Sequence, residues 1–207
     1  MNKKALAYLL SKIKTFKKAK VSLEQYPTEP EIAAEVLWDA YMQGSIEKKT
    51  IADLGCGTGT FGIGALVLGA KNVYFVDIDE EALSIAKENL KVVEIELGMK
   101  LGKASFRCKD IRSFNIKVDC VIQNPPFGVK RSHTDKLFLL KAMSLADEVY
   151  TFHKLATKSF VNSIAEDHGF SALSIKKLEF PLKRSYWFHL KNIYYVDVGV
   201  WHLKKKV

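Results

Sequence analysis

Two segments of the sequence combine residue types and spacings that are suited to chemistry, and the first is Asn124-Pro125-Pro126-Phe127. Two adjacent prolines cannot continue a strand, so the backbone turns stiffly there. The Asn124 side-chain oxygen and the Pro125 carbonyl would be two fixed acceptors for the hydrogens of an exocyclic base amine. Because the lone pair of such an amine is delocalised into the ring, acceptors that favour a pyramidal nitrogen would free it to attack. Phe127 could stack on an unpaired base, whereas a purely structural turn would need neither Asn124 nor Phe127.

The second segment is the glycine loop Asp53-Leu54-Gly55-Cys56-Gly57-Thr58-Gly59, which follows a short apolar run. In an open α/β sheet a ligand binds outside the carboxyl ends of the strands, where a glycine loop lets the backbone approach it closely. Asp77 lies just past the next apolar run, where its carboxylate can accept hydrogen bonds from both hydroxyls of a ribose. The loop spacing is G-x-G-x-G, unlike the G-x-G-x-x-G of dinucleotide enzymes. A tight turn with incidental glycines and a solvated aspartate is the alternative.

Alternating strand and helix patterns must position these two segments. Strand patterns cover 50–54, 72–76, 104–108, 118–122 and 148–151, helix patterns cover 61–68, 79–90, 136–145 and 154–168, and two longer strand patterns cover 173–180 and 193–201. This order predicts an α/β fold with a mostly parallel seven-stranded sheet, an antiparallel strand at its edge and helices on both faces. No linker or repeat divides the chain, so we expect residues 1–207 to form one domain.

The composition indicates a soluble globular protein. The chain has 207 residues, of which 48% are hydrophobic and 27% charged, values that exclude disordered, collagen-like and disulfide-stapled chains. Its three cysteines form no C-x-x-C pair and suggest neither a disulfide framework nor a metal site; we expect Cys108 and Cys120 in the core. The apolar run at 5–10 is too short for a signal peptide or a bilayer span, which predicts a cytoplasmic protein without a membrane anchor.

The positive charge is concentrated at the amino terminus. The net charge is +9, and residues 1–20 contain seven lysines and no acidic residue. Apolar residues at helical spacing in this segment predict a basic amphipathic helix over 1–20. Its lysine face could bind nucleic acid or anionic lipid, or be the solvated face of a docked helix. We expect 21–30 to be an ordered loop, with Thr28 capping the helix that follows.

Together, the two chemical segments resemble a known class of enzyme. With Asp53 two residues ahead of Gly55, the glycine loop is similar to the S-adenosylmethionine pocket of class I methyltransferases, which have a Rossmann-like fold. The resemblance implies that Asp53 helps to position the methionine end, Asp77 binds the ribose, and Asp110 with Ile111 holds the adenine. The tetrad at 124–127 resembles the N-P-P-[YFW] motif of amino methyltransferases, which modify adenine N6, guanine N2 or the glutamine side-chain nitrogen.

Further stretches narrow the resemblance to one family. Residues 23–28, 75–80, 124–128, 152–154 and 186–189 are similar to the methyltransferase-like enzymes that place N6-methyladenosine in small-subunit ribosomal RNA. In that family the loop before the first helix closes over the cofactor. The resemblance therefore implies cofactor contacts from Gln25, Thr28, Gly55, Gly57, Thr58 and Thr60, the last two through their backbone. Eukaryotic members work with a small zinc-containing activator protein, and whether this chain needs one is left open.

The sequence thus predicts an S-adenosylmethionine-dependent adenine-N6 methyltransferase acting on structured RNA, with Asn124, Pro125, Pro126 and Phe127 as catalytic residues. For the RNA substrate we expect contacts from Lys130, Arg131, His153 and Lys154, with His133 beside the first two. The alternatives are a protein glutamine methyltransferase with the same tetrad and a binding protein without turnover. The basic amino-terminal segment favours RNA.

Overall fold

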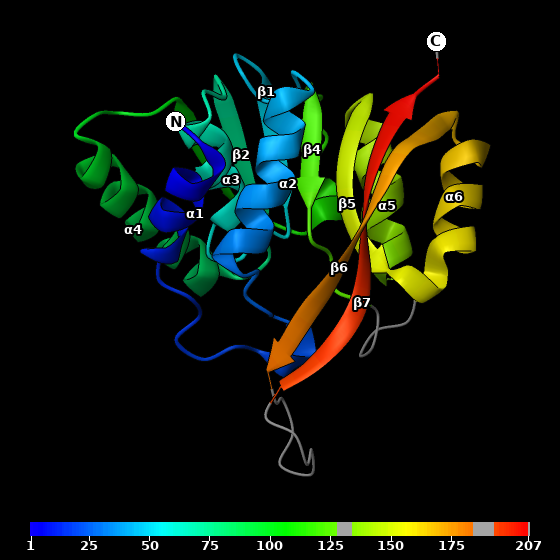
Figure 1. Ribbon diagram of the computed structural model, residues 1–207, viewed down its shortest axis with the longest axis horizontal. Helices are drawn as coiled ribbons and strands as arrows, with labels where there is room; N and C mark the ends of the chain where they lie inside the picture. The colour runs from blue at the N-terminus through cyan, green and yellow to red at the C-terminus, as the bar shows by residue number, and fades with distance from the viewer. Residues whose placement is uncertain (128–133, 184–192, 207) are drawn as a thin grey trace.

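The computed structural model describes residues 1–127, 134–183 and 193–206, whose strands form one sheet in the order β3-β2-β1-β4-β5-β7-β6 (Figure 1). The strands are β1 (Thr50–Leu54), β2 (Asn72–Asp77), β3 (Lys103–Cys108), β4 (Cys120–Gln123), β5 (Glu148–Lys154), β6 (Phe170–Lys183) and β7 (Ile193–Lys205). β1 to β5 run parallel, and β7 lies antiparallel between β5 and β6 at one end of the sheet. The predicted fold class is confirmed.

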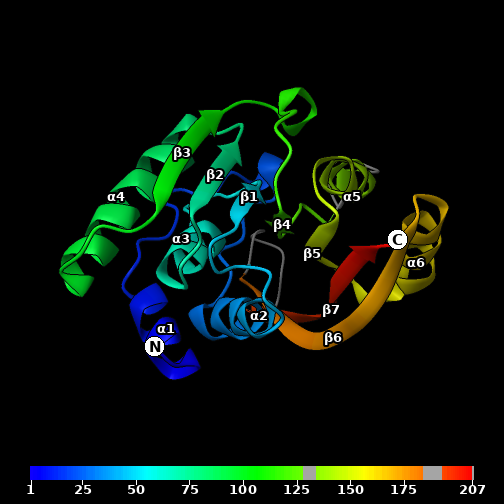
Figure 2. The ribbon, with the colours of Figure 1, turned by 90° about the horizontal axis from the view of Figure 1, so that it is seen from above.

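Helices cover both faces of the sheet (Figure 2). They are α1 (Lys3–Ser11), α2 (Pro30–Met42), α3 (Thr60–Val67), α4 (Glu80–Leu97), α5 (Thr134–Leu145) and α6 (Lys158–Asp167), with short 3-10 turns η1 (Val21–Leu23), η2 (Ile111–Ser113) and η3 (Leu155–Thr157). One core cluster joins α1 to α4 to the sheet, and the other joins α5 and α6 to it. Neighbouring residues of β1, Ile51 and Ala52, belong to different clusters. Burial on both faces therefore explains the continuous apolar runs of the parallel strands.

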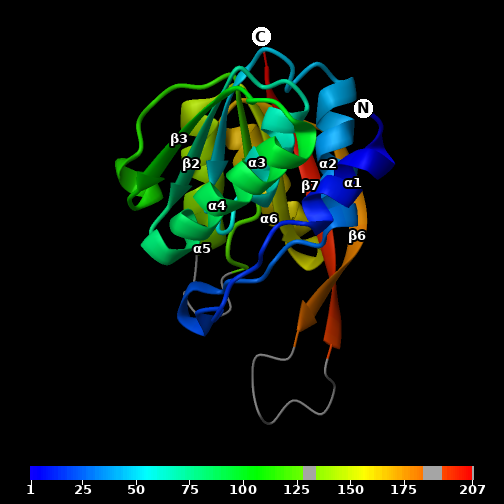
Figure 3. The same ribbon diagram turned by 90° about the vertical axis from the view of Figure 1, so that its left-hand side faces the viewer.

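The segment between α1 and α2, residues 12–29, crosses the carboxyl ends of the parallel strands (Figures 1 and 3). We call it the cover segment. It contains η1 and ends at Pro30, the first residue of α2. Because these strands point toward it, the glycine loop after β1, Asp77 at the end of β2 and Asn124 after β4 all lie at the same end of the sheet.

The structure corrects the extent of the amino-terminal helix. α1 ends at Ser11 rather than near residue 20. The backbone N–H of Lys14 donates to Asn89 Oδ1 at 2.8 Å, and its carbonyl accepts from Asn89 Nδ2 at 2.9 Å. The chain at Lys14 is therefore bonded to α4 and cannot supply the hydrogen bonds that would continue α1.

Two smaller expectations also change. Thr28 does not cap α2, because Glu29 occupies the N-cap position and the Thr28 hydroxyl accepts a hydrogen bond from Asn124 instead. Cys108 is exposed because β3 is an edge strand, whereas Cys120 is buried as predicted. Among the described residues, no helix is both long and apolar enough to cross a membrane.

Candidate active site

A cavity of about 510 Å³ lies at the carboxyl ends of the parallel strands. Its wall brings together the cover segment, the glycine loop, the ends of β2 and β4 and the start of α5. The predicted site residues on this wall are Gln25, Thr28, Gly55, Gly57, Thr58, Thr60, Asp77, Asp110, Ile111, Asn124 and Pro126. The two motifs that were singled out in the sequence therefore share one cavity.

The glycine loop has a conformation that requires glycine. Gly55, Gly57 and Gly59 have φ values of +67°, +52° and +90°, in the left-handed region that L side chains rarely adopt. A Cβ atom at Gly57 would lie 2.8 Å from the Phe16 ring, and one at Gly55 would lie 3.0 Å from Phe138. The loop can approach a ligand and its own neighbours closely only because these side chains are absent.

Asp77 is held at the floor of the cavity. Its Oδ2 accepts from the backbone N–H of Gly57 at 2.8 Å, and its Oδ1 accepts from that of Asp79 at 2.9 Å. Burial raises the pKa of this carboxyl, although the backbone N–H groups of Asp79, Gly57 and Ile78 act in the opposite direction. Two carboxylate oxygens offer about four acceptor sites, so the carboxylate can still accept a hydroxyl donor from a ligand in the cavity.

Asp53 lies beneath the glycine loop and is absent from the cavity wall. Its side chain is 1% exposed, and Oδ2 accepts from the backbone N–H of Gly62 in α3 at 2.8 Å. Burial raises the pKa of this carboxyl to about 7. Asp53 is therefore bonded to α3 and does not face the cavity.

This buried carboxyl gives a testable pH dependence. Its pKa is about 7 in the folded protein against an ordinary value of 3.8, so unfolding releases a proton between these values. The free energy of unfolding of the natural protein should therefore fall, relative to that of Asp53→Asn, by up to about 1.4 kcal/mol per pH unit as the pH rises through this window. Urea denaturation at about pH 5 and pH 8 measures the difference in free energy of unfolding between the two proteins. If this difference is the same at both pH values, the prediction is contradicted.

Asn124 presents an unpaired acceptor at the cavity. Its Nδ2 donates to the Thr28 hydroxyl at 3.0 Å. Its Oδ1 is buried and has no hydrogen-bond partner among the described residues. Because buried polar atoms are rarely left unpaired, this oxygen is available to a donor on a ligand.

Other residues of the predicted site have different surroundings from those expected. Phe127 packs into the core cluster and is absent from the cavity wall, so the expected stacking surface is not on this wall. Cys56 is on the wall, but burial raises the pKa of its thiol, which disfavours a thiolate nucleophile. The Asp110 carboxylate pairs with Arg112 at 2.7 Å, while Ile111 supplies a nearly buried apolar side chain to the wall.

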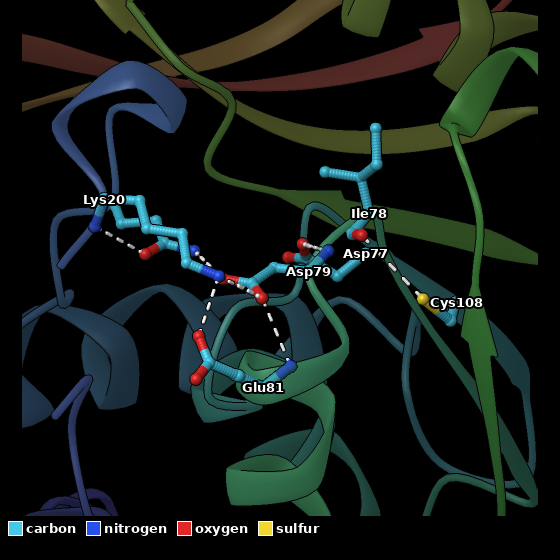
Figure 4. A network of polar contacts seen from close by, with 7 residues as sticks. Lys20, Asp77, Ile78, Asp79, Glu81 and Cys108 are labelled. Carbon is cyan, nitrogen blue, oxygen red and sulfur yellow. Dashed lines mark hydrogen bonds and ion pairs between the residues drawn. The ribbon is translucent and has the colours of Figure 1, made fainter. Parts of the chain in front are cut away.

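A polar network fastens the cover segment to α4 (Figure 4). Lys20 Nζ lies 2.8 Å from both Asp79 Oδ1 and Glu81 Oε2. Gln25 Nε2 donates to Asp79 Oδ2 at 2.7 Å, and Gln25 Oε1 accepts from the Lys20 backbone N–H at 2.8 Å. Both polar atoms of Gln25 are therefore engaged within the chain, which gives Gln25 a role in holding the cover segment.

The sequence analysis missed Asn89. This side chain is 0% exposed, and besides its two bonds to Lys14 it donates to the Thr58 carbonyl at 2.9 Å. It ties the cover segment and the glycine loop to the same point of α4. The available signal was a polar residue in line with the apolar positions Ala82, Ala86 and Val93 of that helix.

The structure places only some of the predicted RNA-contacting residues where they could meet RNA. His153 is 1% exposed, and burial lowers its pKa to about 4, so the structure corrects its assignment to RNA. Its Nε2 lies 3.0 Å from the Thr151 hydroxyl, which accepts from Gln123 Nε2 at the same distance. Lys154 is half-buried at the end of β5. The predicted contacts of Lys130, Arg131 and His133, and the stretch 186–189, lie outside the described residues.

Comparisons with known proteins agree with this geometry. Residues 28–148 match the methyltransferase small domain family. The rRNA N(6)-adenosine-methyltransferase METTL5 of Danio rerio is 37% identical over 203 residues, 97% of this chain and 96% of that protein, and its Drosophila melanogaster counterpart is 33% identical over 91% and 90%. A crystal structure from Pyrococcus horikoshii, provisionally named an RNA methyltransferase, superposes with a TM-score of 0.90 at 41% identity, covering 100% of this chain and 99% of that one. The similarity therefore includes the cover segment as well as both motifs.

Proposed function

The chain belongs to the methyltransferase small domain family and, within it, to the METTL5 family of rRNA N6-adenosine methyltransferases, and from this premise we propose that it methylates adenosine N6 in structured, small-subunit ribosomal RNA. One observation carries the proposal. The buried Oδ1 of Asn124 has no partner among the described residues, and Asn124 lines the same cavity as Asp77. The residues that we assign as amine acceptor and ribose acceptor therefore share one cavity.

The cavity suits a nucleoside cofactor, and we assign it to S-adenosylmethionine. Ile78, Ile111 and Phe138 provide apolar wall, and Asp77 provides a carboxylate for the ribose hydroxyls. The positive-φ glycines let the loop backbone approach the ligand. When bound, S-adenosylmethionine supplies an electrophilic methyl group on a positively charged sulfur.

The residues after β4 act on the substrate amine. Asn124 Oδ1 and the Pro125 carbonyl accept its two N–H hydrogens, which favours a pyramidal nitrogen with a free lone pair. The rigid prolines and the hydrogen bond from Asn124 Nδ2 to Thr28 restrain these acceptors before the substrate arrives. No strong base is needed, because a methylated ammonium is acidic and releases its proton to solvent. His153, buried and neutral, is therefore not required as a base.

The lysines that remain for RNA are fewer than the sequence suggested. Three of the seven in residues 1–20 form ion pairs with acidic residues after β2 and along α4, namely Lys12 with Glu96, Lys14 with Glu88, and Lys20 with Asp79 and Glu81. Lys17 and Lys18 are exposed and follow Phe16, which lines the cavity. We assign these two lysines to phosphates near the target adenosine.

Charge removal tests this assignment without disturbing the core. Deleting residues 1–20 would also remove the buried Leu6, Leu9 and Leu10, so the paired variant Lys17→Gln/Lys18→Gln is the cleaner test. The slope of log affinity for RNA against log salt should flatten by about 0.7 to 0.9 for each lost phosphate contact. Lys3→Gln/Lys4→Gln, near the chain start at the other end of α1, is the matched control (Figure 1). Equal slopes for both variants and the natural protein would refute the contact.

A separate question is whether the chain needs a small zinc-containing activator protein. Strand β3 is an edge of the sheet, so a partner strand could pair with it. Within this chain, α1 already buries apolar surface against α2 and α3. We therefore propose that the purified chain is active alone, which methylation assays with and without an added activator would test.

One experiment separates the proposed function from its alternatives. The chain is incubated with radiolabelled S-adenosylmethionine and either total RNA or total protein. Label in RNA supports the proposal, label in protein supports a glutamine methyltransferase, and cofactor binding without label in either supports a binding protein.

A further inference from the structure

The Thr28 hydroxyl and the Asn124 amide form a contact that joins the cover segment to the motif after β4. Thr28 Oγ1 accepts from Asn124 Nδ2 at 3.0 Å, although the two residues are 96 positions apart. Both residues line the cavity. The cover segment is itself fastened to Asp79 through Lys20 and Gln25 (Figure 4). The position of the hydroxyl is therefore set by a cover segment that is bonded to Asp79.

In the structure the contact engages the nitrogen end of the amide. With its nitrogen bound to Thr28, Asn124 directs its oxygen elsewhere, and that oxygen is buried without a partner among the described residues. Leaving a buried acceptor unpaired is unfavourable, so a ligand donor that reaches it is bound strongly. The observed orientation holds an acceptor ready for an amine.

The opposite orientation would not serve methyl transfer. If the amide were turned over, its NH₂ group would face the substrate amine, and Thr28 would have to donate its only proton to Oδ1, so that this proton would no longer be free for the cofactor contact that the family resemblance implies. The amide N–H groups would repel the amine hydrogens or bind the lone pair that must attack. The orientation of this one side chain therefore decides whether the nitrogen is activated or blocked.

We propose that Thr28 is a positioning residue that fixes the Asn124 amide with its oxygen toward the substrate, so that closure of the cover segment prepares the site for methyl transfer. This inference rests on the proposed function of Asn124. A hydroxyl that accepts from Asn124 keeps its own proton, so the cofactor contact that the family resemblance implies for Thr28 is compatible with the positioning role.

Replacement of the hydroxyl tests the proposal. Thr28→Val keeps the shape and removes the acceptor, Thr28→Ser keeps the acceptor, and Thr15→Val makes the same change at an exposed residue of the cover segment away from the cavity wall. Methylation is followed in single turnovers, with enzyme in excess over RNA and with saturating cofactor, so that slow variants remain measurable. Thr28→Val should lower the rate at least about fivefold, Thr28→Ser should recover most of that loss, and Thr15→Val should stay within about twofold of the natural protein.

Combining Thr28→Val with Asn124→Asp tests whether Thr28 acts through the orientation of the side chain at position 124. Asn124→Asp carries acceptors at both positions, so turning its carboxylate over changes nothing for the amine. Thr28→Val should therefore lower the Asn124→Asp rate by no more than about twofold. Equal losses in both backgrounds, or a Thr28→Val effect confined to the cofactor dissociation constant, would overturn the inference. Failure of the proposed function would look different, because the natural protein would then place no label in RNA. Failure of the role of Asn124 would appear as an Asn124→Ala protein that methylates RNA at nearly the natural rate.

Discussion

Asn124→Ala should abolish most methyl transfer while leaving cofactor binding and folding nearly unchanged. Its Oδ1 has no partner to lose among the described residues, so the folded protein gives up only the bond from Nδ2 to Thr28. The oxygen acts on the amine as it approaches the transition state, and the loss should therefore appear in turnover. Removing one preorganised polar contact typically lowers the rate about 10² to 10³-fold.

Asn124→Asp is the matched control, because it keeps an acceptor at similar reach and should recover part of the activity. Single-turnover methylation at saturating cofactor gives the rates, and thermal denaturation of each variant verifies folding. A rate for the alanine variant within about threefold of the natural protein, less than 1 kcal/mol in barrier, would make the tetrad a structural turn and refute the mechanism.

Asp77→Ala should weaken S-adenosylmethionine binding by about 10- to 100-fold, since a charge-assisted hydrogen bond contributes roughly 1.5 to 3 kcal/mol. The carboxylate lines the cavity and keeps acceptor capacity beyond its bonds to backbone N–H groups. Titration calorimetry measures the dissociation constant directly, and turnover at saturating cofactor should change much less.

Because Asp77 also binds the backbone of Gly57 and Asp79, its removal can loosen the loop as well. Asp77→Asn keeps one acceptor oxygen without the charge and should bind with intermediate affinity. Thermal denaturation of both variants separates lost folding from lost binding. A folded Asp77→Ala protein with unchanged affinity would remove the ribose assignment.

The parts of the site that were predictable from sequence depend on local order along the chain. A strand, a glycine loop and a helix place Gly55 and Gly57 at a strand end, and the next strand places Asp77 beside them, because parallel strands of a βαβ unit are neighbours. The position of Asn124 could be predicted in the same way, because it comes directly after β4, another strand parallel to β1.

What the sequence could not supply are contacts between distant segments. The Thr28–Asn124 bond and the clamp of Asn89 on Lys14 join residues 96 and 75 positions apart. His153 and Phe127 were assigned to substrate because they belong to motif stretches, whereas burial in the sheet and core removes both from the cavity wall. The length of α1 likewise depends on α4, which binds the backbone where the apolar pattern would continue the helix.

Nucleoside mass analysis of small-subunit ribosomal RNA after reaction with the purified chain and S-adenosylmethionine tests the central claim most directly. We predict N6-methyladenosine in the treated RNA and, at equal reaction time, at least about 100-fold less with the Asn124→Ala variant. Methylation at another base or ring position, or label found only in ribosomal protein, would contradict the assignment of the amine acceptors to adenosine N6.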